Sequence, residues 1–225
     1  MSEWWTYRPS DFLMFSPHIY WRLFQSLNEA WWPAQPFVVG TGLTWLVLQR
    51  RVVDDRDGMR VRAAAAFLAV CWVVVAVAFL QQRFSPINWV ASGYAAAFVL
   101  QGLGLLALAL TGGVRTDATG TRRAIGLTLG LWALLGHPLL SVAAGRPWQQ
   151  AEVFGLAPDP TAVGTLAFLC LMSAATRSAQ WLLRSLWAVP LLWCAISAAT
   201  LGTMGALQAW VLVAAAGLAA AAWRR

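Results

Sequence analysis

Lysine is absent from this chain of 225 residues, and acidic residues, histidines and cysteines are few. Without a lysine, no retinal or pyridoxal Schiff base can form, which excludes a rhodopsin-type chromophore. The two histidines are far apart in the sequence, so we predict no metal site. Phosphate-binding glycine loops, nucleophile elbows and dinucleotide fingerprints are also missing, which argues against an enzyme and predicts no cofactor.

Charged residues of either sign are scarce as well. They make up 11% of the chain, against roughly 25% in soluble domains, while apolar residues make up 60% and the mean hydropathy is +0.61. The three cysteines, Cys71, Cys170 and Cys194, lie in apolar stretches, where a thiol is a packing residue rather than part of a disulfide framework. This composition indicates a protein whose solvent is lipid.

What the chain does contain is a series of long apolar runs, rich in Ala and Leu. Such runs suit helices that cross ~30 Å of hydrocarbon, not the ~10-residue alternating strands of a barrel. We predict an all-α integral membrane bundle of seven transmembrane helices. The predicted spans are residues 34–48, 61–81, 87–111, 124–144, 161–175, 179–201 and 203–223.

Arginine distribution predicts the orientation of this bundle. Twelve of the sixteen arginines fall on one side of the predicted spans: Arg50, Arg51, Arg56, Arg60, Arg62, Arg115, Arg122, Arg123, Arg177, Arg184, Arg224 and Arg225. The other side has only Arg8, Arg22, Arg83 and Arg146. The positive-inside rule then places the N-terminus outside and the C-terminus in the cytoplasm. Topology thus accounts for the net charge of +7 without a nucleic-acid partner.

Residues 1–33 form an aromatic-rich outer segment ahead of the membrane domain, which we assign to residues 34–225. Trp4, Trp5 and Tyr7 are suited to the membrane interface. Ser16 and Pro17 mark the start of an amphipathic interfacial helix, with Ile19, Leu23, Leu27 and Trp31 on its apolar face. No removable signal peptide is apparent at the amino end.

Helix signals recur along the membrane domain. Asp159 before Pro160 is interpreted as a helix cap, and residues 147–154 as a short interfacial helix carrying Trp148 and Glu152. Gly126 and Gly130 predict a close helix contact. Pro190 predicts a bend in the sixth span.

Intramembrane polar residues are costly, so the few that occur are candidates for function. His137, in Gly136-His137-Pro138, could hydrogen-bond a neighbouring helix, take up a proton or hold a ligand; the alternative is a packing histidine with satisfied nitrogens. Gln101, in the third span, could bind a solute or join two helices. Arg184 is expected to extend toward the inner headgroups.

Further polar and aromatic residues are expected at the same outer depth as His137. They are Arg22, Glu29, Arg83, Asn88, Arg146, Trp148 and Glu152. Together they could form an external vestibule for a small polar or anionic solute, with Gln101 below it. The alternative is that they decorate the outer rim of the bundle.

Several short motifs resemble those of a family of bacterial multi-pass proteins. They are Trp4-Trp5-Thr6-Tyr7, Ser10-Asp11-Phe12-Leu13, Tyr20-Trp21-Arg22-Leu23-Phe24, Trp32-Pro33-Ala34-Gln35, Ile87-Asn88-Trp89, Gly136-His137-Pro138 and Phe154-Gly155-Leu156-Ala157-Pro158-Asp159-Pro160-Thr161. On these motifs the chain resembles an uncharacterised family that is known only as a domain of unknown function. The resemblance implies a bacterial inner membrane, with a periplasmic outer face, and brings no activity with it.

These observations support more than one function. The first hypothesis is binding or transport of a small solute or ion through the vestibule. The second is a non-catalytic accessory, assembly or sensory role with a membrane-protein partner or a second copy of the chain, motivated by the fifteen tryptophans. A weaker third is haem handling, because His18 and His137 both lie on the outer side.

Overall fold

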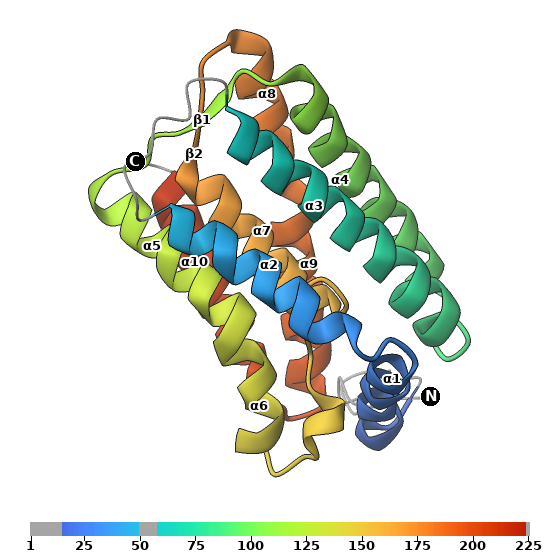
Figure 1. Ribbon diagram of the computed structural model, residues 1–225. Coiled ribbons are helices and arrows are strands. Elements are labelled where there is room, and N and C mark those ends of the chain that lie inside the picture. Colours follow the sequence, from blue (N-terminus) through green and yellow to red (C-terminus); the bar gives the residue numbers. More distant parts are fainter. Residues whose placement is uncertain (1–14, 50–57, 224–225) are drawn as a thin grey trace, which may run out of the picture.

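The computed structural model describes residues 15–49 and 58–223, and it is helical almost throughout (Figure 1). The aromatic residues Trp4, Trp5 and Tyr7, with the arginines at positions 8, 50, 51, 56, 224 and 225, lie outside the described residues. The elements in chain order are α1 (Pro17–Ala30), α2 (Ala34–Leu48), α3 (Met59–Val74), the π-helix η3 (Val75–Phe84), α4 (Ala91–Thr111), β1 (Val114–Thr116), α5 (Gly120–Leu131), the π-helix η4 (Trp132–Gly136), α6 (His137–Ala143), the 3-10 helix η5 (Trp148–Gln150), α7 (Pro158–Leu171), β2 (Met172–Ala174), α8 (Arg177–Ser185), α9 (Ala188–Thr203) and α10 (Gln208–Trp223).

Every apolar range predicted as a span contains a helix, and four continuous helical segments have the length and composition needed to cross a membrane. These are Met59–Phe84, Ala91–Thr111, Gly120–Ala143 and Arg177–Thr203. At 1.5 Å per residue, the shortest of them, of 21 residues, extends ~31 Å, about the thickness of the hydrocarbon core. The apolar helices α2 and α10 are shorter. The chain therefore has the character of a membrane protein.

Helix α7 lies at the centre of the bundle, among α5, α9, α10 and α3 (Figure 1). Every residue of α7 except Gly164 is buried. Glycines on α5 permit this close approach: a Cβ at Gly126 would lie 3.2 Å from the Ala167 carbonyl oxygen, and one at Gly130 would lie 2.9 Å from Leu46. The predicted contact of the Gly126 and Gly130 face is thus made, chiefly with α7.

Helices α8 and α9 are separated by a break at Leu186 and Trp187. Proline has no N–H, so Pro190 cannot bond the carbonyl of Leu186, four residues earlier. The Gln101 amide, from α4, donates a 2.9 Å hydrogen bond to that carbonyl instead. The break thus lies one turn before Pro190, and Gln101 joins two helices rather than reaching toward a vestibule.

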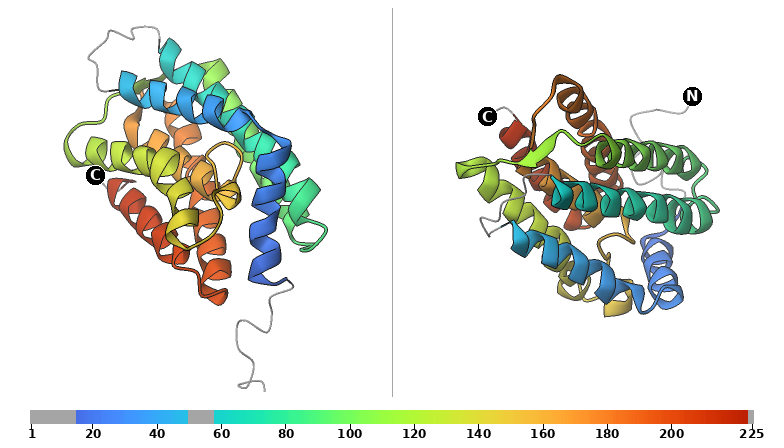
Figure 2. Two further views of the ribbon diagram at one scale, coloured as in Figure 1. Left: turned by 60° about the horizontal axis from the view of Figure 1, so that its bottom comes forward. Right: turned by 45° about the horizontal axis from the view of Figure 1, so that its top comes forward.

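Helix α1 begins as the sequence predicts, because the Ser16 hydroxyl accepts a hydrogen bond from the Ile19 N–H. Its buried face differs from the predicted one: Tyr20, Trp21, Phe24 and Leu27 are buried, whereas Ile19 and Trp31 are largely exposed. Aromatic stacking explains this choice, since the Phe24 ring lies 4.6 Å from that of Phe79 on η3. Helix α1 lies at an angle to α2 and packs beside η5 (Figure 2).

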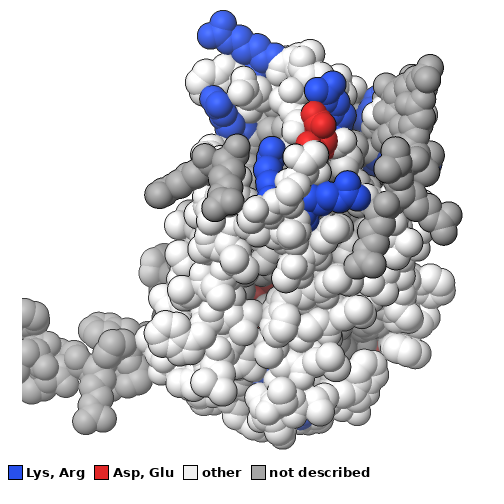
Figure 3. Space-filling view, turned by 90° about the vertical axis from the view of Figure 1, so that its left-hand side faces the viewer, with Lys and Arg blue, Asp and Glu red and all other residues white. Residues whose placement is uncertain are grey.

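Most of the described basic side chains gather at one end of the molecule (Figure 3), the end at which Figure 1 shows β1, β2 and the start of α8. Strands β1 and β2 pair antiparallel there, a two-stranded element that the sequence analysis did not predict. Arginines at this end hold carbonyl groups at helix ends: Arg62 donates to Ala109, Arg122 to Met172 and Arg123 to Gln49. These cations therefore stabilise helix C-termini as well as carrying charge.

Candidate metal centre in the bundle

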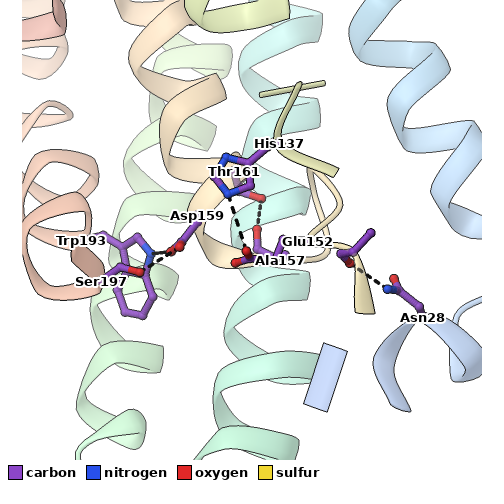
Figure 4. A network of polar contacts seen from close by, with 9 residues as sticks. Asn28, His137, Glu152, Ala157, Asp159, Thr161, Trp193 and Ser197 are labelled. Carbon is purple, nitrogen blue, oxygen red and sulfur yellow. Dashed lines mark hydrogen bonds and ion pairs between the residues drawn. The ribbon is translucent and has the colours of Figure 1, made fainter. Parts of the chain in front are cut away.

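Three titratable side chains from three different segments meet inside the bundle (Figure 4). They are His137 at the start of α6, Glu152 in the loop after η5, and Asp159 in the first turn of α7. One ligand atom from each lies within 4.8 Å of the others, and the His137 Nε2 to Glu152 Oε2 distance is 3.8 Å. All three are buried, with relative exposures of 1%, 2% and 0%.

His137 lies where the π-helix η4 gives way to α6. Neither of its ring nitrogens has a hydrogen-bond partner among the described residues. A neutral imidazole carries one donor and one acceptor, and leaving such buried groups unpaired costs ~1–3 kcal/mol each. The described residues thus include no hydrogen-bond partner that satisfies the His137 nitrogens, which leaves both available to a ligand.

Asp159 does not act as the predicted helix cap. Helix α7 begins one residue earlier, and its N-cap residue, Ala157, has no side chain that could bond the helix end. The Asp159 carboxylate instead turns toward α9, where Oδ1 accepts from the Trp193 indole N–H at 2.7 Å and Oδ2 accepts from the Ser197 hydroxyl at 2.8 Å. Two donors thus fix the orientation of this buried carboxylate (Figure 4).

A short helix was predicted for residues 147–154, but within this range only η5 is helical. Glu152 lies in the extended chain that follows η5. The helix prediction is wrong, and the reason is a set of contacts with α1. The side-chain amide group of Asn28 donates 2.8 Å hydrogen bonds to the backbone carbonyls of Gln149 and Ala151. These bonds hold the loop extended across α1 and turn Glu152 into the bundle, where its Oε1 has no partner among the described residues.

The Glu152 carboxyl group lies near the charged groups of Asp159 and Arg146 and near Tyr20. Burial raises the pKa of Glu152 well above the ordinary value, the negative charge of Asp159 raises it further, and the Arg146 guanidinium opposes both. Arg146 itself lies 3.5 Å from the centre of the Trp21 ring, a cation–π contact. Burial, followed by the negative charges of Asp159 and Glu152, raises the pKa of Tyr20 well above its usual range. The Arg146 guanidinium therefore interacts electrostatically with the buried Glu152 carboxyl group and with Tyr20.

The other residues predicted for the vestibule do not join this cluster. Arg22 and Trp148 are exposed, and the Asn88 carboxamide accepts from the Val90 N–H within its own turn. Arg83 donates to the Ala78 carbonyl of its own helical segment. Of the residues predicted for the vestibule, the structure brings together His137, Glu152 and Arg146.

Sequence reasoning missed four members of the site: Asp159, Tyr20, Trp193 and Ser197. Asp159 carried a usable signal, since an acidic residue at the edge of an apolar span is rare and is often functional. Trp193 and Ser197, which donate hydrogen bonds to Asp159, lie 34 and 38 residues further along the chain, and no sequence signal linked them to it. The exclusion of a metal site rested on the distance between His18 and His137, and it does not apply to one histidine with two carboxylates.

The ligand atoms of His137, Glu152 and Asp159 lie slightly farther apart than they would around a bound metal ion. Nitrogen and oxygen ligands lie ~2.0–2.2 Å from a tetrahedral metal ion, which places them about 3.4 Å apart. The His137–Glu152 pair, at 3.8 Å, is close to this value, and the widest pair would need to close by at most ~1.4 Å. Asp159 keeps lone pairs for a metal while it accepts from α9, because a carboxylate has about four acceptor positions.

Comparisons with known proteins place the chain in a family without an assigned activity. Searches of curated proteins and of solved structures find no match. A family described as of unknown function, DUF6064, matches residues 17–225, a range that contains His137, Glu152 and Asp159. The chain therefore belongs to the family of unknown function DUF6064.

Proposed function

We propose that this protein is a multi-pass protein of the bacterial inner membrane that binds a divalent metal cation on its periplasmic side, with His137, Glu152 and Asp159 as ligands. The observation that carries this proposal is the buried cluster itself, whose histidine nitrogens are unpartnered and whose ligand atoms lie within 4.8 Å of one another. The sequence predicts binding of a small solute or an ion, and this proposal specifies a divalent cation.

The proposed orientation of the bundle in the membrane follows from the distribution of its basic residues. In the proposed topology the apolar helices α2, α3–η3, α4, α5–α6, α7, α8–α9 and α10 are the seven spans, and α1 lies at the outer interface. The basic end, which contains β1, β2 and the start of α8, faces the cytoplasm under the positive-inside rule. The metal-ligand cluster is then near the periplasmic end, beside α1 and η5.

The ligand types select the class of ion. One imidazole with two carboxylates suits first-row divalent ions such as Mn²⁺, Fe²⁺ and Zn²⁺, whereas Ca²⁺ and Mg²⁺ prefer sites built wholly of oxygen. Two ionised carboxylates and a neutral imidazole carry a charge of −2, which a divalent cation neutralises. A cation would thereby offset the cost of burying these carboxylates, which is several kcal/mol for each unpaired ion.

A pocket at the outer end offers an approach to the site. It has a volume of about 180 Å³ and lies between α1, the start of α2 and η5. Its lining includes Val153, the residue next to Glu152, together with Glu29 and Trp148. A cation from the periplasm would reach this pocket before it meets the loop that carries Glu152.

Metal binding to the purified protein tests the proposal. We expect the protein in neutral detergent, stripped with a chelator, to bind one Zn²⁺ or Mn²⁺ and to unfold at a higher temperature when the ion is present. Asp159→Asn and His137→Gln should each remove the thermal shift. His18→Gln is the matched control, because His18 is the other histidine of the chain and is exposed on α1.

A second readout separates loss of binding from loss of folding. Each variant should keep a cooperative unfolding transition in the absence of metal, which shows that it is folded. The proposal fails if the folded wild-type protein binds neither ion above the level of the Asp159→Asn variant. It also fails if the His18→Gln variant loses as much binding as the His137→Gln variant does.

A further inference from the structure

A second polar pocket lies at the opposite, basic end of the bundle. It has a volume of about 410 Å³ and lies between β2, α8, the first turn of α5 and the end of α10. Its lining includes two arginines and two tryptophans, and none of the residues that line it is acidic.

The two arginines of this pocket are held in different ways. Arg122 is fixed by hydrogen bonds from Nη2 to the carbonyls of Met172, at 2.6 Å, and Leu169, at 3.4 Å. Its Nε is buried and has no partner among the described residues. Arg184 is exposed and lies 5.9 Å from the centre of the Trp181 ring, so its guanidinium is open to a ligand. One fixed cation and one adaptable cation therefore line the same pocket.

The tryptophans place this pocket at the level of lipid headgroups. Trp187 and Trp223 pack edge to face with their ring centres 4.9 Å apart, and both line the pocket. Trp181 and Trp223 are also exposed, at 62% and 45%. Indole rings concentrate at the boundary between headgroups and hydrocarbon. A ligand of this pocket would thus have its charge at headgroup depth and apolar surface next to it.

We propose that this pocket binds the phosphate headgroup of an anionic phospholipid, with Arg122 and Arg184 as its charged contacts. Guanidinium groups bind phosphate oxygens through paired N–H donors, and basic pockets between membrane helices accommodate anionic headgroups. The lipid's acyl chains would lie along the exposed apolar surface beside Trp181 and Trp223. This site is independent of the metal centre and depends only on the membrane placement of the bundle.

Lipid binding to the full-length protein tests the proposal. The protein in neutral detergent is titrated with phosphatidylglycerol or phosphatidylcholine, and the bound lipid is counted by native mass spectrometry. We expect tighter binding of phosphatidylglycerol. Arg184→Gln should weaken that binding about fivefold, the effect of one arginine near a headgroup. Arg177→Gln on the same helix is the matched control, because Arg177 is exposed and does not line the pocket.

Three results would overturn the proposal. Equal affinities for the two lipids would remove the charge argument. Equal losses in the Arg184→Gln and Arg177→Gln variants would indicate attraction to the basic end as a whole instead of a defined pocket. Millimolar inorganic phosphate that raises the unfolding temperature of the lipid-free protein as much as phosphatidylglycerol does would assign the pocket to a free anion. Because the metal ligands are unchanged in these variants, their Zn²⁺ affinity should equal that of the wild type.

Discussion

The Ser197 hydroxyl offers the sharpest test of the proposed metal centre, because it contacts a proposed ligand without being one. It donates a 2.8 Å hydrogen bond to Asp159 Oδ2 deep inside the bundle. Ser197→Ala removes this donor and leaves the backbone of α9 unchanged. Asp159 would then keep only the indole donor of Trp193 and would lose part of its fixed orientation.

Two independent estimates give the size of the effect. A hydrogen bond to a charged group contributes ~1.5–3 kcal/mol, which corresponds to about 10- to 150-fold in a dissociation constant. Loss of a group that orients a metal ligand typically costs 10- to 100-fold in metal affinity. We therefore expect Ser197→Ala to weaken Zn²⁺ binding roughly 10- to 100-fold.

Competition with a chelating dye measures this dissociation constant in detergent. Thr200→Ala is the matched control, because Thr200 lies on the same helix and its hydroxyl bonds the Ile196 carbonyl of that helix. The control should bind Zn²⁺ as the wild type does. If Ser197→Ala binds Zn²⁺ as tightly as Thr200→Ala, Asp159 is not a ligand and the reasoning is refuted.

Three further predictions concern the fold around the site. The folded state raises the pKa of Glu152, so the metal-free protein binds a proton that the unfolded chain releases. The contribution of Glu152 to stability should therefore be complete below its ordinary pKa of about 4.5 and decrease as the pH rises toward the folded-state pKa, and Glu152→Gln should remove this contribution from the pH dependence of thermal unfolding. Gln101→Leu should lower the free energy of unfolding by ~1–3 kcal/mol, because the Leu186 carbonyl loses its donor; a variant as stable as the wild type would contradict the account of the α8–α9 break. Gly155→Ala should destabilise more than Gly145→Ala in thermal unfolding, since both have positive φ but only at Gly155 would a Cβ lie 2.4 Å from Val38; equal effects would show that the packing of this loop is loose.

The sequence predicted a helix correctly wherever a long apolar run determines it. The range 34–48 coincides with α2, and the predicted 179–201 span lies within the α8–α9 segment. The β1–β2 pair was not predictable, because three-residue strands between helices show no usable alternation. The position of the α8–α9 break follows from the missing N–H of Pro190, although its hydrogen-bond donor, Gln101, comes from a distant helix.

The candidate site was predictable in part, and the part that was missed depends on tertiary contacts. His137 was identifiable as a polar residue within an apolar span, and Glu152 as a charged residue of an external loop predicted at the same depth. The prediction for Asp159 failed because local chemistry favoured a helix cap, whereas donors on α9 determine where its carboxylate points. The extended conformation of the Glu152 loop likewise depends on Asn28, more than 120 residues earlier. Such long-range pairs leave no periodic signal in a single sequence.

The three proposed ligands differ in mobility, and this difference predicts how an ion enters and leaves. His137 and Asp159 belong to helices, whereas Glu152 lies on a loop that Asn28 holds with two hydrogen bonds. At ~1 kcal/mol each, these bonds oppose opening of the loop by about 2 kcal/mol, or roughly 30-fold in population. Asn28→Ala should therefore speed Zn²⁺ release about 30-fold in a stopped-flow chelator assay.

Gln25→Ala supplies the matched control for this prediction, because Gln25 lies on the same helix and meets the same loop through one longer bond, 3.4 Å from Gln150. Its effect on release should be a few-fold at most. Equal release rates in the Asn28→Ala variant and the wild type would show that the ion leaves without opening this loop. Release would then depend on the helices that carry His137 and Asp159, and the outer pocket beside Val153 would not be the route.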